Sequence, residues 1–417
     1  MSALTNASSG TEKRIAATSA IVLSFIVALE FVIMISPFAF VFYAALNPFL
    51  LALNQSVLTR WLTAFFLPHM VVPPNLLLKA VRVLGSVFFL LGMAVFIVCA
   101  VQVYGGKLLK LGVASRGLYR VVRHPQYMGL AIAALGLALM WPRFLTLVLF
   151  AIMLWLYYLL ARDEERRMLN RFGEGYGAYL ERTGMFVPCW IERLCRRSKK
   201  KRQPLTAAGA AAILVVLLII CAGTGVLLRG YTVHHLQLAQ VGGIDVITIT
   251  PEDLQPAEEL VEGITQDTDV SGKLAALPSG DGHRVLAYFV PVDYIMQGMI
   301  ADTGEQWKLF QHHKTVRLIA EYVVHPFSHL TGGHAHSAAA SHNFSMHDSP
   351  LMKRRIIFVE ISGEHQQRLA SAYDDFDINA QHRPLFFVDV HMHTGQILQL
   401  TELHEGSGWG RVPTPTF

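Results

Sequence analysis

The stretch that decides the fold reads GLYRVVRHPQYMG over residues 117–129. Two apolar segments follow it, and only three residues, WPR at 141–143, separate them. Because three residues cannot cross a bilayer, the two segments are predicted to turn back on each other as a tight helical hairpin. After the hairpin the chain carries RDEERR at 162–167 and FGEGY at 172–176. Both polar clusters are therefore expected on one side of the membrane, where a site can form at the boundary with water.

Composition agrees with a membrane protein. Only 16% of the 417 residues are charged, against about 25% in soluble domains. The net charge of +5 is what basic cytoplasmic loops produce, and no nucleic-acid-binding motif accompanies it, so we expect no nucleic-acid partner. The four cysteines match no zinc motif or disulfide framework.

Apolar runs predict about five membrane spans, which follow a polar, disordered tail at 1–14. The spans are expected at 15–46, 76–103, 128–140, 144–161 and 205–228. Residues 47–75 are less uniform and are expected as an outer-face segment with interfacial helix character. Basic residues between 107 and 123, and again at 196–202, place those loops in the cytoplasm. The N-terminus is then cytoplasmic and residues 230–417 lie outside, in the periplasm if the membrane is a bacterial inner membrane.

The last 188 residues are predicted to form a soluble α+β domain. Its expected strands are 243–250, 283–292, 356–361, 384–391 and 396–401, and its expected helices are 256–264 and 306–322. Thr394 and Gly395 are expected to turn the last two strands into a hairpin. The fold class is therefore an all-α transmembrane helical bundle followed by an α+β domain, with boundaries at 1–14, 15–203, 204–229 and 230–417.

The polar clusters around the hairpin hold the groups that S-adenosylmethionine would require. That methyl donor carries a sulfonium cation, a carboxylate and an ammonium, so its site needs carboxylates, cationic donors and aromatic faces. Pro125 starts a helix well, which puts His124 close to a helix N-terminus where anions bind. The alternative is that Arg-His-Pro is only a positive-inside anchor and Glu-Glu-Arg-Arg a solvated helix turn. The candidate set comprises Tyr119, Arg123, His124, Tyr127, Glu164 and Glu165.

The order and spacing of these elements resemble a known superfamily. Arg-His-Pro-x-Tyr-x-Gly at 123–129, a helical hairpin, Glu-Glu at 164–165 and Phe-Gly-x-x-Tyr-x-x-Tyr at 172–179 look like isoprenylcysteine carboxyl methyltransferases and phospholipid N-methyltransferases. The resemblance covers about 112–188. It implies a cytoplasm-facing S-adenosylmethionine pocket and a lipid or lipidated substrate entering from the bilayer. It also implies that the cofactor is held by Tyr119, Arg123, His124, Pro125, Gln126, Tyr127 and Glu164.

Glu165 and Arg162 are the catalytic candidates. The eukaryotic prenylcysteine enzymes carry, shortly before the double Glu, an arginine for the substrate carboxylate; here Leu159 and Leu160 stand in that place and Arg162 is the nearest basic residue. Methyl transfer is expected to be direct and in line, with the protein supplying positioning and exclusion of water. An amine acceptor must be deprotonated, and Glu165 and Glu30 are the two candidates for taking the proton. The sequence leaves the acceptor and the oligomeric state open.

Histidines concentrate in the outer domain. Sixteen of the 18 follow residue 229, and histidine is the commonest metal-binding side chain. Zinc or copper binding in a His-rich loop is one interpretation; a solvated, pH-responsive loop is the other. The metal candidates are His325, His329, His334 and His336.

Two other functions compete with the methyltransferase. One is a membrane reductase of the steroid-reductase type, which shares an Arg-His-Pro-x-Tyr signature and uses NADPH, but usually has Asn where Gln126 stands. The other is a non-catalytic membrane anchor for a metal-binding periplasmic domain. The presence of both Glu164 and His124 favours the enzyme.

Overall fold

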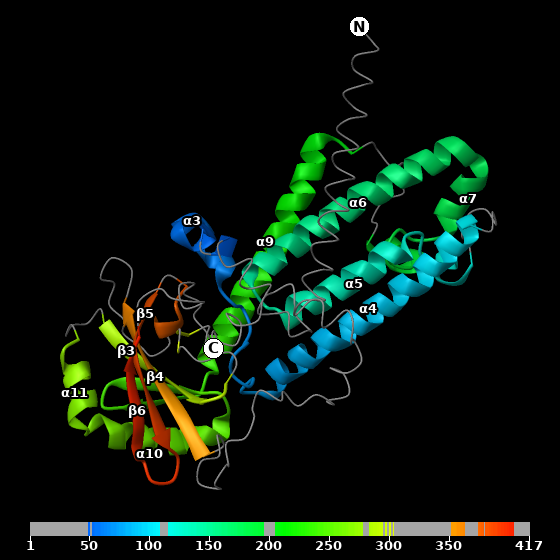
Figure 1. Ribbon diagram of the computed structural model, residues 1–417. Coiled ribbons are helices and arrows are strands. Elements are labelled where there is room, and N and C mark those ends of the chain that lie inside the picture. Colours follow the sequence, from blue (N-terminus) through cyan, green and yellow to red (C-terminus); the bar gives the residue numbers. More distant parts are fainter. Residues whose placement is uncertain are drawn as a thin grey trace. The chain divides into compact units, whose positions relative to one another are not determined.

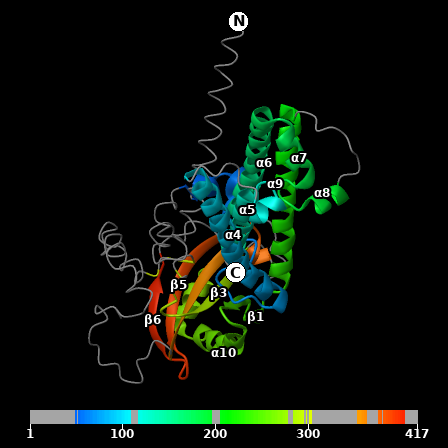
Figure 2. The same ribbon diagram turned by 90° about the vertical axis from the view of Figure 1, so that its right-hand side faces the viewer.

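The computed structural model describes residues 49–50, 52–108, 116–195, 205–277, 283–294, 297, 300–301, 303, 352–362, 374–378 and 380–403. These residues form two compact units. One contains the described residues from Leu77 to Leu228, and the other those up to Leu76 and from Arg229 onward. Figures 1 and 2 show the helices of the first unit and the sheet of the second. The expected tail at 1–14 and first span at 15–46 lie outside the described residues.

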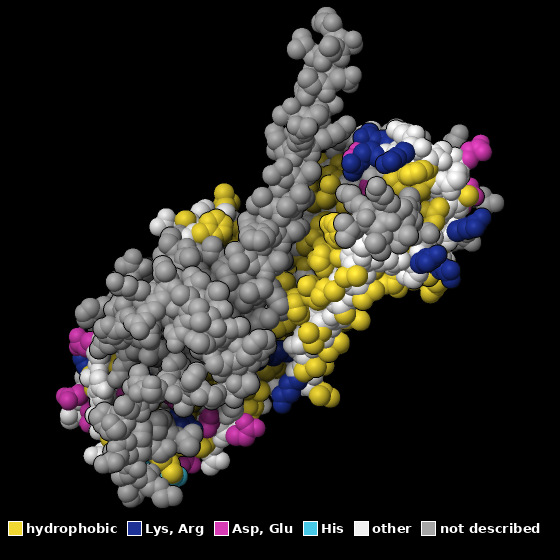
Figure 3. Space-filling model, turned by 45° about the vertical axis from the view of Figure 1, so that its right-hand side comes forward, with side chains coloured by type: hydrophobic (Ala, Val, Ile, Leu, Met, Phe, Trp, Pro, Cys, Tyr) yellow, Lys and Arg dark blue, Asp and Glu magenta, His cyan; other side chains and the backbone are white. Residues whose placement is uncertain are grey.

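The first unit is helical and confirms the hairpin. It is formed by α4 (Leu76–Leu108), α5 (Pro125–Met140), α6 (Phe144–Phe172), α7 (Glu174–Arg182), α8 (Cys189–Cys195) and α9 (Ala207–His234). Within the described residues, three helices are long and apolar enough to cross a membrane, at Leu76–Gly106, Phe144–Phe172 and Ala207–His234, and α5 is a shorter apolar helix. Hydrophobic side chains line the surface of this unit and Lys and Arg gather toward its end (Figure 3).

Helix α6 runs further than the sequence predicted. The apolar span was expected to end at Ala161, but one helix continues to Phe172. No Gly or Pro lies between these positions, so nothing interrupts the helix. It ends at Gly173, whose φ of +56° strongly favours a residue without a side chain. The carboxylates of Glu164 and Glu165 therefore project from one continuous helix.

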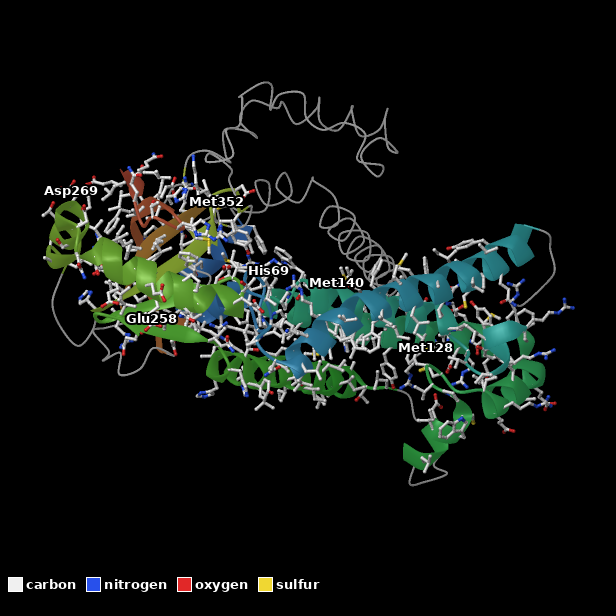
Figure 4. All side chains as sticks on the ribbon, turned by 90° about the horizontal axis from the view of Figure 1, so that it is seen from below. His69, Met128, Met140, Glu258, Asp269 and Met352 are labelled. Carbon is white, nitrogen blue, oxygen red and sulfur yellow. The ribbon has the colours of Figure 1, made fainter. Side chains whose placement is uncertain are left out.

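Glycines let α4 and α5 approach each other closely. A Cβ added to Gly92 of α4 would lie 2.3 Å from the backbone nitrogen of Ala133, and one added to Gly136 of α5 would lie 2.4 Å from that of Phe89. Small residues at such crossings allow backbone contact between membrane helices. Met128 and Met140, labelled in Figure 4, lie near the two ends of α5. The contact therefore fixes the α5–α6 hairpin against α4 along much of its length.

We expect Gly92→Ala to destabilise this unit and Gly105→Ala to leave it intact. The first methyl group overlaps the backbone of α5, whereas nothing lies within 4 Å of the position a Cβ would take at Gly105 of the same helix. Overpacking of this kind costs about 1–3 kcal/mol. Thermal unfolding of the two variants in detergent measures the difference, and equal unfolding temperatures would contradict the close crossing.

The second unit is built on a six-stranded sheet in the order β1-β2-β3-β4-β5-β6. Its strands are β1 (Leu238–Val241), β2 (Ile244–Thr248), β3 (His283–Pro291), β4 (Lys353–Ser362), β5 (Gln381–His391) and β6 (Ile397–Glu402). Only β2 and β3 are parallel, and the other neighbours are antiparallel. Helices α10 (Leu254–Thr265) and α11 (Thr268–Ala275) connect β2 to β3, and α10 packs on one face of the sheet (Figure 1).

All five predicted strands and the helix at 256–264 are confirmed, with shifted ends. Gly395, at φ +65°, turns β5 into β6 as expected. The short strand β1 and the helix α11 were missed, because four and eight residues carry little periodicity. The predicted helix at 306–322 lies outside the described residues.

The face of the sheet opposite α10 carries buried charges. Arg355 pairs with Asp389 through two hydrogen bonds of 2.7 Å and reaches Gln297 at 3.1 Å. On neighbouring strands, Arg284 bonds to Asp245 and lies 3.0 Å from the Asp375 carboxylate. Buried charges of this kind persist when they are paired, because an unpaired one would neutralise or unfold the site.

Asp375 makes the stability of this unit depend on pH. Burial, and then the nearby Asp245 carboxylate, raise the pKa of Asp375 from 3.8 to about 8, although Arg284 opposes the shift. The folded state therefore holds a proton that the unfolded state releases, and stability falls as pH rises toward 8. His382, which contacts the Asp375 carbonyl, has its pKa lowered by burial from 6.5 to about 4. It has the opposite effect on stability below pH 6.5, so of these two groups only Asp375 makes stability depend on pH above that value.

We therefore expect the unfolding temperature of the wild-type protein to fall between pH 6.5 and pH 8. One proton changes the free energy of unfolding by at most about 1.4 kcal/mol per pH unit. Asp375→Asn, which keeps the shape and cannot ionise, should flatten this dependence. Thermal unfolding of both proteins across this pH range measures the dependence. If the unfolding temperature changed equally with pH in the two proteins, Asp375 would already be ionised in the folded state.

Candidate active site

A short backbone ladder joins the residues before α5 to those after α7. The Arg123 amide donates to the Gly184 carbonyl at 2.8 Å, and the Gly184 amide donates to the Val121 carbonyl at 3.1 Å. The His124 amide continues the ladder to the Met185 carbonyl at 3.1 Å. Tyr119 and Tyr179 add a further link, because the Tyr179 hydroxyl donates to the Tyr119 carbonyl at 2.7 Å. The two motifs, about 60 residues apart in sequence, therefore form one structure.

Arg123 is the side chain that ties these segments together. Its Nε lies 2.6 Å from Glu165 Oε1, and both side chains are buried. Its Nη1 donates to the Leu180 carbonyl at 3.0 Å and to the carbonyl of Thr183. The guanidinium thus joins α6 to the end of α7, and Glu165 neutralises it. This arrangement uses the fixed fork geometry of arginine, which lysine cannot reproduce.

His124 lies between the two carboxylates of α6. Its Nδ1 is 3.6 Å from Glu164 Oε2 and its Nε2 is 3.6 Å from Glu165 Oε1. These distances are too long for hydrogen bonds, and the buried Nε2 has no hydrogen-bond partner. Only 6% of the His124 side chain is exposed, whereas 48% of that of Glu164 is. The site therefore offers one accessible carboxylate beside a buried imidazole with unused hydrogen-bonding capacity.

Aromatic rings extend from His124 into the hairpin. The ring of Tyr127 stacks on His124 at a centroid distance of 5.6 Å and on Tyr157 of α6 at 5.1 Å. Phe186 approaches His124 from the other side at 6.0 Å, in a tilted arrangement. Stacked rings present π faces to which a cation is attracted. The imidazole is therefore bordered by aromatic rings on two sides.

The tyrosines of α7 remain neutral hydroxyls. Burial, followed by the charge of Glu165, raises the pKa of Tyr176 to about 12 despite the opposing effect of Arg123. Burial likewise raises the pKa of Tyr179 and of Tyr119 above the ordinary range. At neutral pH these groups donate hydrogen bonds and add no negative charge to a site that already contains two carboxylates.

The structure brings most of the predicted site residues together, whereas Gln126 and Arg162 form hydrogen bonds with residues outside the predicted site. Tyr119, Arg123, His124, Tyr127, Glu164 and Glu165 lie around the start of α5, where Pro125 occupies the first turn. The Gln126 amide donates to the Cys99 carbonyl of α4 at 3.3 Å. Arg162 donates to the hydroxyl of Tyr158, one turn earlier on α6, at 3.3 Å. The cofactor role of Gln126 and the catalytic role of Arg162 stay predictions.

Sequence reasoning missed Tyr157 and Gly184. Tyr157 looked like one more aromatic residue of an apolar span, and its stacking on Tyr127 follows from the packing of α5 on α6. Gly184 has no motif around it, although an added Cβ would lie 1.7 Å from the Val187 carbonyl oxygen. The one feature of the sequence that indicates Gly184 is its position shortly after a Tyr-rich helix.

The predicted metal ligands lie outside the described residues. These are His325, His329, His334 and His336. Across the described part of the chain, no group of three or more His, Cys, Asp or Glu side chains is arranged to hold a metal ion.

Comparison with known proteins points to methyltransferases. Residues 80–175 match the family model of phospholipid methyltransferases. A protein-S-isoprenylcysteine O-methyltransferase of Schizosaccharomyces pombe is 33% identical over 73 residues, which are 17% of this chain and 31% of that protein. Protein-S-isoprenylcysteine O-methyltransferase A of Arabidopsis thaliana is 33% identical over 78 residues, which are 18% of this chain and 40% of that protein.

The matches cover a limited part of each protein. The chain spans between about a third and two fifths of the length of these curated relatives, and no solved structure matches it significantly. The matched residues 80–175 contain α5, α6 and the His124–Glu164–Glu165 group, and the sheet lies beyond them. The helical segment that carries the site is therefore similar to isoprenylcysteine O-methyltransferases and to the phospholipid methyltransferase family model.

Proposed function

We propose that this protein is an integral membrane methyltransferase that uses S-adenosylmethionine and acts on a lipophilic acceptor, an isoprenylcysteine-like carboxylate or a phospholipid amine. The observation that carries the proposal is His124, which is buried between Glu164 and Glu165 with its Nε2 unpartnered. A buried polar atom without a partner is uncommon and marks a place where a ligand group can bind. The comparisons support the same reaction class, and neither matched family is a reductase.

The residues present fit S-adenosylmethionine. The exposed Glu164 carboxylate would hold its ammonium group, His124 and the neutral hydroxyls of Tyr119 and Tyr176 would donate hydrogen bonds, and the aromatic rings beside His124 would border its positive charge. When bound, this cofactor supplies an electrophilic methyl group. The protein contributes orientation: Arg123 and Glu165 fix the start of α5 against α7, and the apolar hairpin excludes water from one side.

Glu165 is better suited to positioning than to proton transfer. Its carboxylate already accepts a 2.6 Å hydrogen bond from Arg123 and is almost fully buried. A general base must reach the proton it takes. Glu164 is half exposed, but its carboxylate is the group that would hold the cofactor's ammonium. We therefore assign a positioning role to Glu165 and a cofactor-binding role to Glu164.

A transfer assay tests the proposal. Purified protein is incubated with methyl-labelled S-adenosylmethionine and either a prenylated cysteine analogue or phospholipid vesicles, and label in the organic phase is counted. We expect transfer to one of the two acceptors and a loss of about 100-fold in Glu164→Gln. Asp163→Asn is the matched control, because Asp163 pairs with Arg166 at the surface. Equal activity in the two variants would contradict the role of Glu164.

A further inference from the structure

Residues 49–76 of the second unit divide into a buried half and an exposed half. Phe65 and Phe66 are fully buried, whereas three apolar side chains in the preceding part face outward. Leu58 of α3 (Val57–Arg60) is 84% exposed and Val57 is 60% exposed, and Phe49 is exposed as well. Scattered exposed apolar residues are ordinary, but this group stands on a segment that leads directly into the membrane helix α4.

The buried half fixes the segment firmly to the sheet domain. Arg229 donates to the Phe65 carbonyl, and the Tyr294 hydroxyl donates to the Met70 carbonyl at 2.6 Å. The Val72 amide donates to the Ile249 carbonyl at 2.7 Å. The exposed side chains therefore project from a well-anchored base. Figure 1 shows α3 beyond the ends of β3 and β5.

Three polar side chains in the exposed half donate to carbonyls of the segment itself, although Asn54 Oδ1 is buried without a hydrogen-bond partner. Thr59 Oγ1 donates to the Leu53 carbonyl at 2.6 Å, and Arg60 Nε donates to the Asn54 carbonyl at 3.2 Å. Trp61 Nε1 donates to the Leu58 carbonyl at 2.9 Å. In a hydrocarbon environment an unbonded carbonyl costs several kcal/mol. Side chains that donate hydrogen bonds to these carbonyls therefore suit a turn that is transferred from water into the membrane.

The chain places this segment at the membrane surface. The exposed apolar face of α9 extends to Leu227, and Arg229, which bonds to Phe65, follows only two residues or about 3 Å later along the helix axis. Asn75 donates to the Tyr231 hydroxyl at 3.1 Å, just before α4 begins at Leu76. The segment is thus bonded to the part of α9 where that helix leaves its apolar span.

We infer that the segment around α3 anchors the sheet domain to the lipid bilayer. The side chains of Phe49, Val57 and Leu58 insert into the boundary between headgroups and acyl chains. The occupant of this surface is the bilayer itself. Trp61 lies beside them and has the amphipathic character typical of residues at that depth. This contact would hold the sheet domain against the membrane independently of the methyl-transfer site.

Site-directed fluorescence tests the inference on the full-length protein in nanodiscs. An environment-sensitive dye is attached to Leu58→Cys, in a background in which Cys99, Cys189, Cys195 and Cys221 are replaced by alanine. The matched control is Glu258→Cys on α10, an exposed position of the same unit that is labelled in Figure 4. We expect a blue-shifted emission at position 58 that is quenched by lipids carrying a nitroxide near the headgroup, and a water-like, unquenched emission at position 258.

Two results would overturn the inference. A water-like emission at position 58 would show that the side chain faces solvent. A blue-shifted emission that lipid nitroxides do not quench would show that protein covers the surface instead. Unchanged thermal unfolding of both labelled proteins establishes that the labels report on the folded state.

Discussion

Arg123→Met is expected to destabilise the helical unit by about 3–5 kcal/mol and to abolish cofactor binding. The substitution leaves the Glu165 carboxylate buried without its 2.6 Å partner and removes the hydrogen bonds to the Leu180 and Thr183 carbonyls. The end of α7 is then no longer tied to the start of α5. Thermal unfolding in detergent and titration with S-adenosylhomocysteine measure the two effects.

A double variant separates the charge from the backbone contacts. Arg123→Met combined with Glu165→Gln removes both charges, so it should be more stable than Arg123→Met alone while still binding the cofactor poorly. Arg166→Met is the control, because that arginine pairs with Asp163 at the surface, where a salt bridge contributes about 1 kcal/mol or less. If the double variant were no more stable than the single one, the buried ion pair would not be the source of the effect.

Gly184→Ala is expected to be nearly as damaging, for a steric reason. The added Cβ would lie 1.7 Å from the Val187 carbonyl oxygen, a distance that only backbone movement can relieve. Gly184 accepts from Arg123 and donates to Val121, so movement there shifts the residue that precedes His124. We expect lost methyl transfer, because displacements of about 1 Å at a site cost roughly 100-fold in rate.

Gly177→Ala is the opposite case in the same region. Gly177 lies within α7 and has open space where a Cβ would be placed. Replacing glycine by alanine in a helix stabilises it by about 1 kcal/mol. The unfolding temperatures of the two alanine variants should therefore shift in opposite directions, and only Gly184→Ala should lose methyl transfer. Loss of activity in Gly177→Ala alone would place the sensitive backbone in α7 and not in the ladder.

The hairpin could be predicted from the sequence because its signal is local. Apolar runs on either side of a three-residue break admit one arrangement, and α5 and α6 have it. The same reasoning found His124, Glu164 and Tyr127, which are grouped in short motifs. It could not find the ladder to Gly184, because backbone pairing between segments about 60 residues apart leaves no periodicity in either of them.

The adjacent residues Glu164 and Glu165 show a second limit of prediction from the sequence. Adjacent residues on a helix point about 100° apart, so one of the two must face the interior and the other outward. The sequence contains no feature that says which. The structure buries Glu165 against Arg123 and leaves Glu164 half exposed, and the catalytic role of Glu165 stays a prediction. In the sheet domain, Asp245 and Arg355 were similarly invisible, because charged residues in strands are usually on the surface.

The central claim is that the His124–Glu164 group holds S-adenosylmethionine. Isothermal titration of the detergent-purified protein with S-adenosylhomocysteine tests it most directly, beside a His124→Ala, Glu164→Ala double variant whose folding is checked by thermal unfolding. The account predicts micromolar binding with one site per chain to the wild-type protein, and none to the folded double variant. No binding to the wild-type protein, or equal binding to both, would contradict it.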